Sequence, residues 1–359
     1  MTSQKLTQDF TETLVQEVAW QGTFFGPKVP IETIYLGGGT PSLLQISQIA
    51  TILESVHQHF DTSNVLECTL EINPDDVDLS YLKSLRSLGI DRLSIGIQSF
   101  FEEDLQWMNR AHTAEQAQAI VDMARAAGFD RFSVDLIFGL PEQFEERWHA
   151  NLDKALALDI PHLSTYGLTI EPQTPLYRQV ELGRQTPISE HKSAGIYQHT
   201  MDKLRAAGYE HYEISSFCKP GERSQHNQRY WLHDNYLGLG PSAHSFWQSE
   251  NRPASRWANV RNLKKYISWG GDENPPLDFQ EHVEPLQLAN EYIMLRLRTR
   301  DGLQLSTLSE KYGLDIHPAK VEHIVNNGMA RLDASGVLSL TDQGLLLCDT
   351  ITESLMSAG

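Results

Sequence analysis

Four junctions along the chain share one pattern, in which an apolar helix end leads through a turn into a β-branched run. They are RSLGIDRLSIG (86–96), RAAGFDRFSVDLIFG (125–139), LALDIPHLSTYG (156–167) and RAAGYEHYEIS (205–215). Three of them carry Gly where the helix ends, a position that favours left-handed backbone. Two further extended runs, 31–36 and 66–72, are each followed by a helical pattern. We therefore expect six βα steps between residue 31 and about residue 215.

Regular βα alternation predicts an α/β fold with a parallel sheet, and six evenly spaced steps favour a partial β/α barrel. We assign residues 1–215 to this barrel. Periodicity is lost in the connecting region 216–284, which holds four of the seven Trp residues. Residues 285–359 read as three helices and a β-hairpin, the pattern of a small winged-helix-like domain. This domain carries six basic and nine acidic residues, which argues against DNA reading.

The composition is globular, with 40% hydrophobic residues among 359. There are 29 Lys and Arg against 47 Asp and Glu, and the net charge of −18 argues against a nucleic-acid or anionic-membrane binder. No apolar run is long enough for an integral membrane segment, so we expect a cytoplasmic protein with a small-molecule or protein partner. Cys68, Cys218 and Cys348 are too far apart for a zinc motif or a disulfide framework. We expect three reduced, mostly buried thiols.

Polar residues follow the predicted strands, where the active face of a β/α barrel lies. Gly37-Gly38-Gly39-Thr40-Pro41-Ser42 comes after the first strand, and a bare glycine turn is the alternative to a ligand loop there. Glu71 and Asn73 share one face of the second strand, where Glu71 either holds a ligand or forms a structural ion pair. The remaining candidates lie at or after later strands: Ser94, Gly96, Gln98, Arg110, Asp135, Tyr166, Gly167 and Glu213. Asp135 interrupts an apolar strand, which is costly unless the carboxylate has a partner.

These stretches resemble a known family. The residues that carry the resemblance are YLGGGTPSLL (35–44), LEINPDD (70–76), RLSIGIQSF (92–100), MNRAH (108–112), VDLIFGLP (134–141), HNQRYW (226–231) and YLGLGPSAHSF (236–246). They resemble the radical S-adenosylmethionine proteins related to oxygen-independent coproporphyrinogen III oxidase, and most of all their heme-chaperone branch. The resemblance implies that Gly39 and Thr40 contact the methionyl end of S-adenosylmethionine. It also implies that Glu71, Gln98, Arg110, Asp135 and Gly167 line its site.

One motif of that family is absent. The family begins with a strand ending in C-x-x-x-C-x-x-C, whose three thiolates hold a [4Fe–4S] cluster. Residues 5–20 resemble the helix that follows this loop, and the cluster ligands are not in the sequence. We expect the missing strand and cysteines to be encoded upstream of Met1, the alternative being a cluster-free descendant. No catalytic residue or metal ligand is therefore assigned, and whether the chain is an enzyme stays open.

Aromatic residues and histidines gather between residues 226 and 257. Tyr230, Trp231, Tyr236, Phe246 and Trp247 offer flat apolar faces suited to a porphyrin. His226 is the first candidate for an axial heme ligand, with His233 and His244 behind it. The resemblance implies a heme chaperone that binds heme for transfer to an acceptor protein. The alternatives are a coproporphyrinogen III oxidase, which decarboxylates its substrate oxidatively, and a cluster-free binding protein on the same scaffold.

Overall fold

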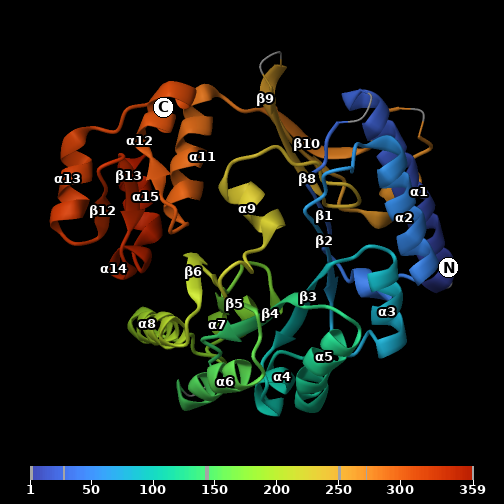
Figure 1. The fold of residues 1–359 in the computed structure, drawn as a ribbon, viewed down its shortest axis with the longest axis horizontal. Helices are drawn as coiled ribbons and strands as arrows, with labels where there is room; N and C mark the ends of the chain where they lie inside the picture. Colours follow the sequence, from blue (N-terminus) through green and yellow to red (C-terminus); the bar gives the residue numbers. More distant parts are fainter. Residues whose placement is uncertain (1–2, 27–28, 142–144, 250–251, 272, 358–359) are drawn as a thin grey trace.

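A seven-stranded sheet forms the centre of the protein, in the order β1-β2-β3-β4-β5-β7-β6 (Figure 1). The computed structural model describes residues 3–26, 29–141, 145–249, 252–271 and 273–357. The strands of this sheet are β1 (Thr33–Leu36), β2 (Glu67–Ile72), β3 (Arg92–Gln98), β4 (Arg131–Phe138), β5 (His162–Gly167), β6 (Glu210–Glu213) and β7 (Ser216–Cys218). Strands β1 to β5 pair in parallel, as the βα pattern predicts.

The helices of the barrel are α1 (Ser3–Phe25), α2 (Ile46–His59), α3 (Leu79–Ser87), α4 (Glu102–Trp107), α5 (Ala114–Ala126), α6 (Glu145–Ala157), α7 (Pro175–Glu181) and α8 (Glu190–Ala206). Their ends follow from local sequence. Thr113 and Gln116 form a capping box at the start of α5. Gly89, Gly128 and Gly208 follow helices with positive φ, which confirms the predicted turns.

The sheet is not parallel throughout. β7 is antiparallel to both β5 and β6, and it lies between them. This strand was not predicted, because residues 216–218 sit in a stretch without clear periodicity. Among the described strands β1 and β6 do not pair, so the sheet stays open as the predicted partial barrel.

One face of the sheet is apolar and packs against helices. Its side chains include Leu70, Ile72, Leu93, Ile95, Val134 and Leu136, all almost completely buried. They join one core cluster with residues of α2, α3, α5 and α6. Burying each such side chain contributes about 1.5–3 kcal/mol to folding. Because side chains alternate along a strand, the residues between these positions face the inside of the barrel.

The connecting region is more ordered than its sequence pattern indicates. It holds α9 (Gln225–Trp231), β8 (His244–Ser249), β9 (Arg252–Asn259), α10 (Leu263–Ile267) and β10 (Leu277–His282). The three strands form an antiparallel sheet in the order β10-β9-β8, here called the outer sheet. Figure 1 shows it above the barrel, with α9 between the two sheets.

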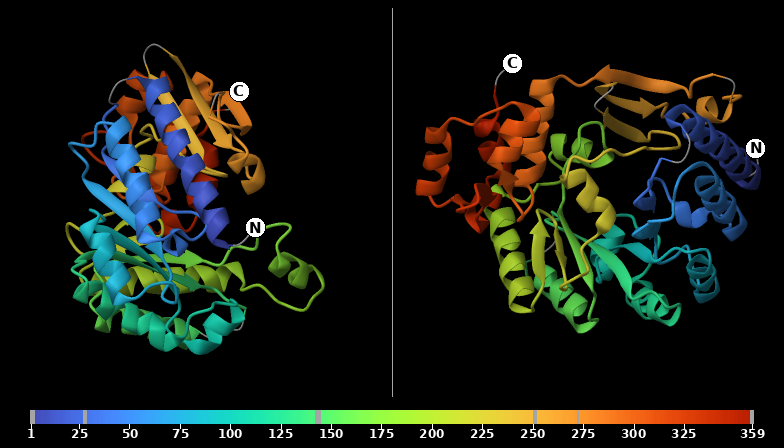
Figure 2. Two further views of the ribbon diagram at one scale, coloured as in Figure 1. Left: turned by 90° about the vertical axis from the view of Figure 1, so that its right-hand side faces the viewer. Right: turned by 45° about the horizontal axis from the view of Figure 1, so that its top comes forward.

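The buried carboxylate of Glu17 links helix α1 to the outer sheet through hydrogen bonds. Glu17 accepts hydrogen bonds from the Tyr266 hydroxyl at 2.6 Å, the Asn259 amide at 2.6 Å and the Gly240 backbone N–H at 2.8 Å. Burial raises the pKa of Glu17, and these three donors act in the opposite direction. Figure 2 shows α1 running alongside the strands of the outer sheet.

The C-terminal residues form the predicted three helices and hairpin. The elements are α11 (Pro285–Leu297), β11 (Leu303–Gln304), α12 (Leu305–Tyr312), α13 (Pro318–Asn326), β12 (Ala330–Leu332), β13 (Val337–Leu340), α14 (Asp342–Leu345) and α15 (Cys348–Leu355). Strand β11 completes a three-stranded sheet, and α14 and α15 were not predicted. The division of the chain at residues 215 and 284 stays a prediction.

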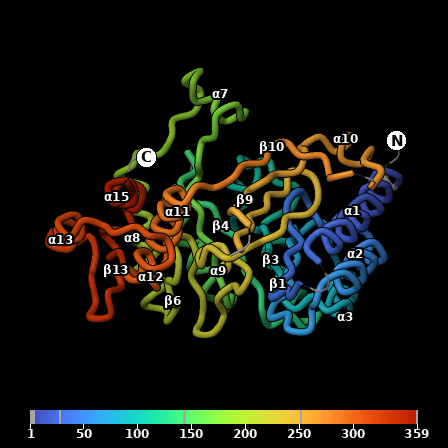
Figure 3. Tube along the Cα trace, turned by 90° about the horizontal axis from the view of Figure 1, so that it is seen from above, coloured from blue at the N-terminus to red at the C-terminus, as the bar shows by residue number. Residues whose placement is uncertain are grey.

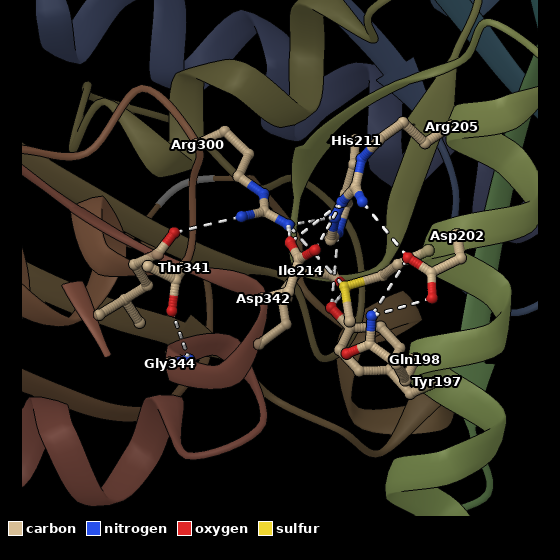
Figure 4. Close-up of polar contacts among 12 residues, drawn as sticks. Tyr197, Gln198, Asp202, Arg205, His211, Ile214, Arg300, Thr341, Asp342 and Gly344 are labelled. Atoms are coloured by element: carbon tan, nitrogen blue, oxygen red, sulfur yellow. Dashed lines mark hydrogen bonds and ion pairs between the residues drawn. The ribbon is translucent and has the colours of Figure 1, made fainter. Parts of the chain in front are cut away.

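A polar junction joins this domain to the barrel (Figure 4). Arg300 pairs with Asp342 and donates to His211 Nδ1 at 2.9 Å and to the Leu340 carbonyl at 3.1 Å. Arg205 on α8 reaches the same Asp342 at 2.8 Å. Burial and the neighbouring Arg300 lower the pKa of His211 to about 3, so His211 is neutral and accepts from Arg300. Helix α7 by contrast stands away from the body of the protein, as Figure 3 shows.

None of the helices in the described part of the chain is long and apolar enough to cross a membrane.

Candidate functional site

The inside face of the barrel sheet is polar. It carries Glu67, Glu71, Arg92, Ser94, Arg131, Ser133, Asp135, His162 and Ser164 at alternate strand positions. The interior of a closed β/α barrel is normally filled by branched apolar side chains. A lumen lined by charges and hydroxyls is therefore suited to a polar ligand rather than to a packed core.

Glu71 connects the second strand to the glycine loop after β1. Its carboxylate accepts hydrogen bonds from the Tyr35 hydroxyl at 2.8 Å and from the Gly38 backbone N–H at 3.0 Å. A Cβ on Gly37 would lie 2.4 Å from Tyr35 Cε1 and 2.7 Å from Glu71 Oε1. Gly37 therefore lets the loop approach Glu71 closely. Gly39, two residues after Gly37, has a φ of 69°, and the side chain of Thr40 makes no capping hydrogen bond to the following turn.

Gln98 and Arg110 meet around Gly96 at the end of β3. Gln98 has a φ of 67°, and the ladder to β4 shifts between Ile95 and Gln98. Arg110 donates to Asn73 Oδ1 at 2.7 Å and to the Gly96 carbonyl at 3.3 Å. A Cβ on Gly96 would lie 3.1 Å from Gln98 Nε2 and 3.2 Å from Asn73 Oδ1. The small residue keeps these polar groups close to one another.

Asp135 lies in the middle of this polar face. The hydroxyls of Ser164 and Ser94, on the two neighbouring strands, donate to its carboxylate. Burial raises the pKa of Asp135 to about 6; the Ser164 hydrogen bond lowers it, and the negative charge of Glu71 raises it further. Asp135 therefore has the partners that its position requires, and it lies on the same face as Glu71.

Gly167 is the last residue of β5, the strand that pairs with the Asp135 strand β4. A Cβ there would lie 3.3 Å from the Phe138 ring. Tyr166, the preceding residue, is 43% exposed. Glu213 at the end of β6 is buried, and burial raises its pKa too.

A second polar group, not found from the sequence, fills the base of the lumen. Glu67 is fully buried and accepts from Arg131 at 2.8 Å. It also accepts from the first turn of α9, through the backbone N–H groups of residues 225 and 226, both at 3.0 Å, and the Ser224 hydroxyl at 3.2 Å. Arg92 Nε lies 3.9 Å from Glu67, and within the described chain its two terminal nitrogens have no hydrogen-bond partner.

His226 lies on the first turn of α9 and packs against β1. Its ring stacks on Tyr35 with centroids 4.8 Å apart. Nδ1 lies 2.8 Å from the Thr33 hydroxyl, and Nε2 lies 3.0 Å from the Tyr230 hydroxyl. Burial lowers the pKa of His226 to about 4. Both ring nitrogens are engaged, so axial ligation by His226 requires one of these hydrogen bonds to break.

Comparison with known proteins decides the family. The description "Radical SAM superfamily" matches residues 10–155, and "HemN C-terminal domain" matches residues 283–347. The Bacillus subtilis (strain 168) protein "Heme chaperone HemW" is 34% identical over 321 residues, which are 88% of this chain and 83% of that protein. The Escherichia coli (strain K12) protein of the same name is 30% identical over 331 residues, 91% of this chain and 84% of that protein. The chain belongs to the HemW family of radical SAM proteins.

A solved structure extends the comparison to the fold. Coproporphyrinogen III oxidase (HemN) from Escherichia coli superposes with a TM-score of 0.83 at 22% identity, covering 99% of this chain and 85% of that one. At this identity the likeness shows the fold alone. It confirms the α/β barrel with a small C-terminal domain that the sequence of this HemW-family chain predicts.

Membership of the HemW family implies S-adenosylmethionine and a [4Fe–4S] cluster, and the residues present fit only the first. The lumen offers the carboxylate of Glu71, and the buried Arg110 Nε has no hydrogen-bond partner within the described chain. The three cysteines are free and buried, and burial raises the pKa of Cys68 and of Cys218 to about 12. Within the described residues no group of three His, Cys, Asp or Glu side chains could hold a metal. The residues that the structure describes therefore do not fit the cluster.

Proposed function

We propose that this protein binds heme in the cytoplasm and releases it to an acceptor protein. The observation that carries the proposal is its similarity to proteins named heme chaperones over 321 residues. That length exceeds the barrel, so the similarity also includes the outer sheet or the C-terminal domain. The flat aromatic side chains of the connecting region are chemically suited to a porphyrin.

We further propose that S-adenosylmethionine binds in the barrel lumen. Glu71, Gln98, Arg110 and Asp135 would hold it through their polar side chains, while Gly39, Thr40 and Gly167 would lie at the mouth of the lumen. The Glu71 and Asp135 carboxylates suit the positive sulfonium and the hydroxyls of the ribose. When bound, S-adenosylmethionine supplies an adenosyl group attached to a sulfonium. This chain's own residues bind and orient it.

Titration of the purified chain with hemin tests the proposal. Saturable binding at one heme per chain, with a shifted Soret band and no conversion of the porphyrin, is the expected result. Coproporphyrinogen III should be recovered unchanged from a parallel incubation with S-adenosylmethionine and a reductant. Conversion of coproporphyrinogen to its decarboxylated product would favour the oxidase alternative, and failure to bind hemin would contradict the proposal.

A further inference from the structure

The outer sheet presents two tryptophans on one face. The β-ladder pairs Trp247 with Ser255 and Trp257 with Ser245, so both indoles project to the same side. The Phe25 ring, at the end of α1, lies 4.3 Å from the Trp247 ring and 6.4 Å from the Trp257 ring between centroids. All three aromatic residues stay partly exposed. This aromatic face therefore consists of three apolar rings, with the Phe25 ring at the end of α1 tilted by 37° against Trp247.

His282 lies on the same face, on the neighbouring strand β10. Its ladder partner is Ser255, which is also the partner of Trp247, so the three residues form one row across the sheet. Trp257 is the diagonal neighbour of His282, within reach of a large side chain. His282 is exposed, so a ligand can reach its ring.

The hydrogen bonds around His282 fix which nitrogen is free. The Ser255 hydroxyl donates its single proton to the Pro253 carbonyl at 3.2 Å, since a carbonyl can only accept. The same hydroxyl oxygen lies 3.1 Å from His282 Nδ1, so it accepts a proton from Nδ1. In the neutral imidazole the lone pair is then on Nε2, and no described residue bonds this atom. An Nδ1–H bond that orients the ring is the usual arrangement of a ligating histidine.

The other histidines of the region lack this combination. His226 has both nitrogens engaged, as described above. His233 stacks between Phe246 and Tyr312, with Nδ1 3.2 Å from the Tyr312 hydroxyl and Nε2 3.3 Å from Glu291. His244 is on the opposite face of the outer sheet, where its ring lies 5.7 Å from Phe279.

We propose that the aromatic face binds the heme, with His282 Nε2 as the axial ligand to the iron; this rests on the proposed function. The macrocycle lies along Trp247 and Trp257 on the side from which His282 coordinates. Arg252 on β9 pairs with Ser249, two residues after Trp247 on β8. Its guanidinium lies 5.4 Å from the Phe24 ring and offers a cation to a propionate. An exposed site with one axial ligand is also consistent with release of the heme to an acceptor.

Hemin titration of the wild-type chain and of single-residue variants tests the proposal. The wild-type chain should give a histidine-ligated Soret spectrum, and His282→Ala should lose that spectrum and bind about tenfold or more weakly. His244→Ala, a matched exposed histidine on the other face, should behave as wild type. Trp257→Ala should weaken binding without changing the ligand signature, and added imidazole should restore the spectrum of the His282→Ala protein.

The outcomes separate this inference from the proposed function. If wild type binds hemin and His282→Ala gives an unchanged spectrum and affinity, His282 is not the ligand while heme binding stands. Loss of the spectrum in His226→Ala instead would move the ligand to His226 and overturn the inference. If the wild-type chain shows no saturable binding, both proposals fail.

Discussion

Replacing Asp135 by Asn tests whether the barrel holds a buried carboxylate at a cost in stability. The amide keeps the shape of the side chain and can still accept from Ser94 and Ser164. Burial raises the pKa of Asp135 from 3.8 to about 6 in the fold. Because the folded-state pKa lies above the unfolded value, the contribution to stability is complete below about pH 4 and is lost as the pH rises through 6. The Asn variant should therefore be more stable than wild type at neutral pH.

The size of the gain follows from the two pKa values. A difference of about two corresponds to about 3 kcal/mol of unfolding free energy at pH 7.5. By its exposed surface Asp135 is only partly buried, so solvent screening lowers the expected gain to about 1–2 kcal/mol. At pH 4.5 the same two pKa values predict about a third of that gain in stability for the Asn variant. Urea unfolding of both proteins at the two pH values measures it, and an equal gain at both, or none at pH 7.5, would refute the reasoning.

Three further substitutions have defined outcomes. Glu67→Gln leaves Arg131 and the first turn of α9 without their buried charge and should lower the urea-unfolding free energy by about 3–5 kcal/mol; a loss under about 1 kcal/mol would contradict this. Gly37→Ala pushes a methyl group into the Tyr35 ring. It should weaken S-adenosylmethionine binding, measured by calorimetry, about tenfold or more while the fold stays intact. Unchanged binding would show that this loop is not part of the site. Arg300→Ala should lower the free energy of unfolding by about 2 kcal/mol and speed proteolysis between the barrel and the C-terminal domain. An unchanged cleavage rate would show that the ion pair between Arg205 and Asp342 is sufficient to hold the two domains together.

The barrel, and the placement of polar residues at the ends of its strands, were predictable because each sequence signal is local. Gly37 and Glu71 mark the ends of two apolar strands, and Asp135 is a single carboxylate within a third apolar run. Tyr35 could have been found by the same alternation, since it lies two residues before Gly37 on the same face.

The base of the lumen and the outer sheet were not predictable in this way. Glu67 looks like a boundary residue of its strand, and its partners on α9 lie 157 to 159 positions further along the chain. Strand β10 is exposed at nearly every position, so it has no apolar stripe for a pattern to detect. His282 becomes a candidate ligand only when the ladder places it beside Ser255.

Transfer of bound heme to an apoprotein tests the central claim most directly. The heme-loaded chain is mixed in a stopped-flow instrument with increasing concentrations of an apo form of a b-type heme protein, and the Soret change is followed. If the protein hands heme to an acceptor, the transfer rate should rise with acceptor concentration, because a complex forms before the heme moves. A rate that is independent of acceptor concentration would show passive dissociation and contradict the account.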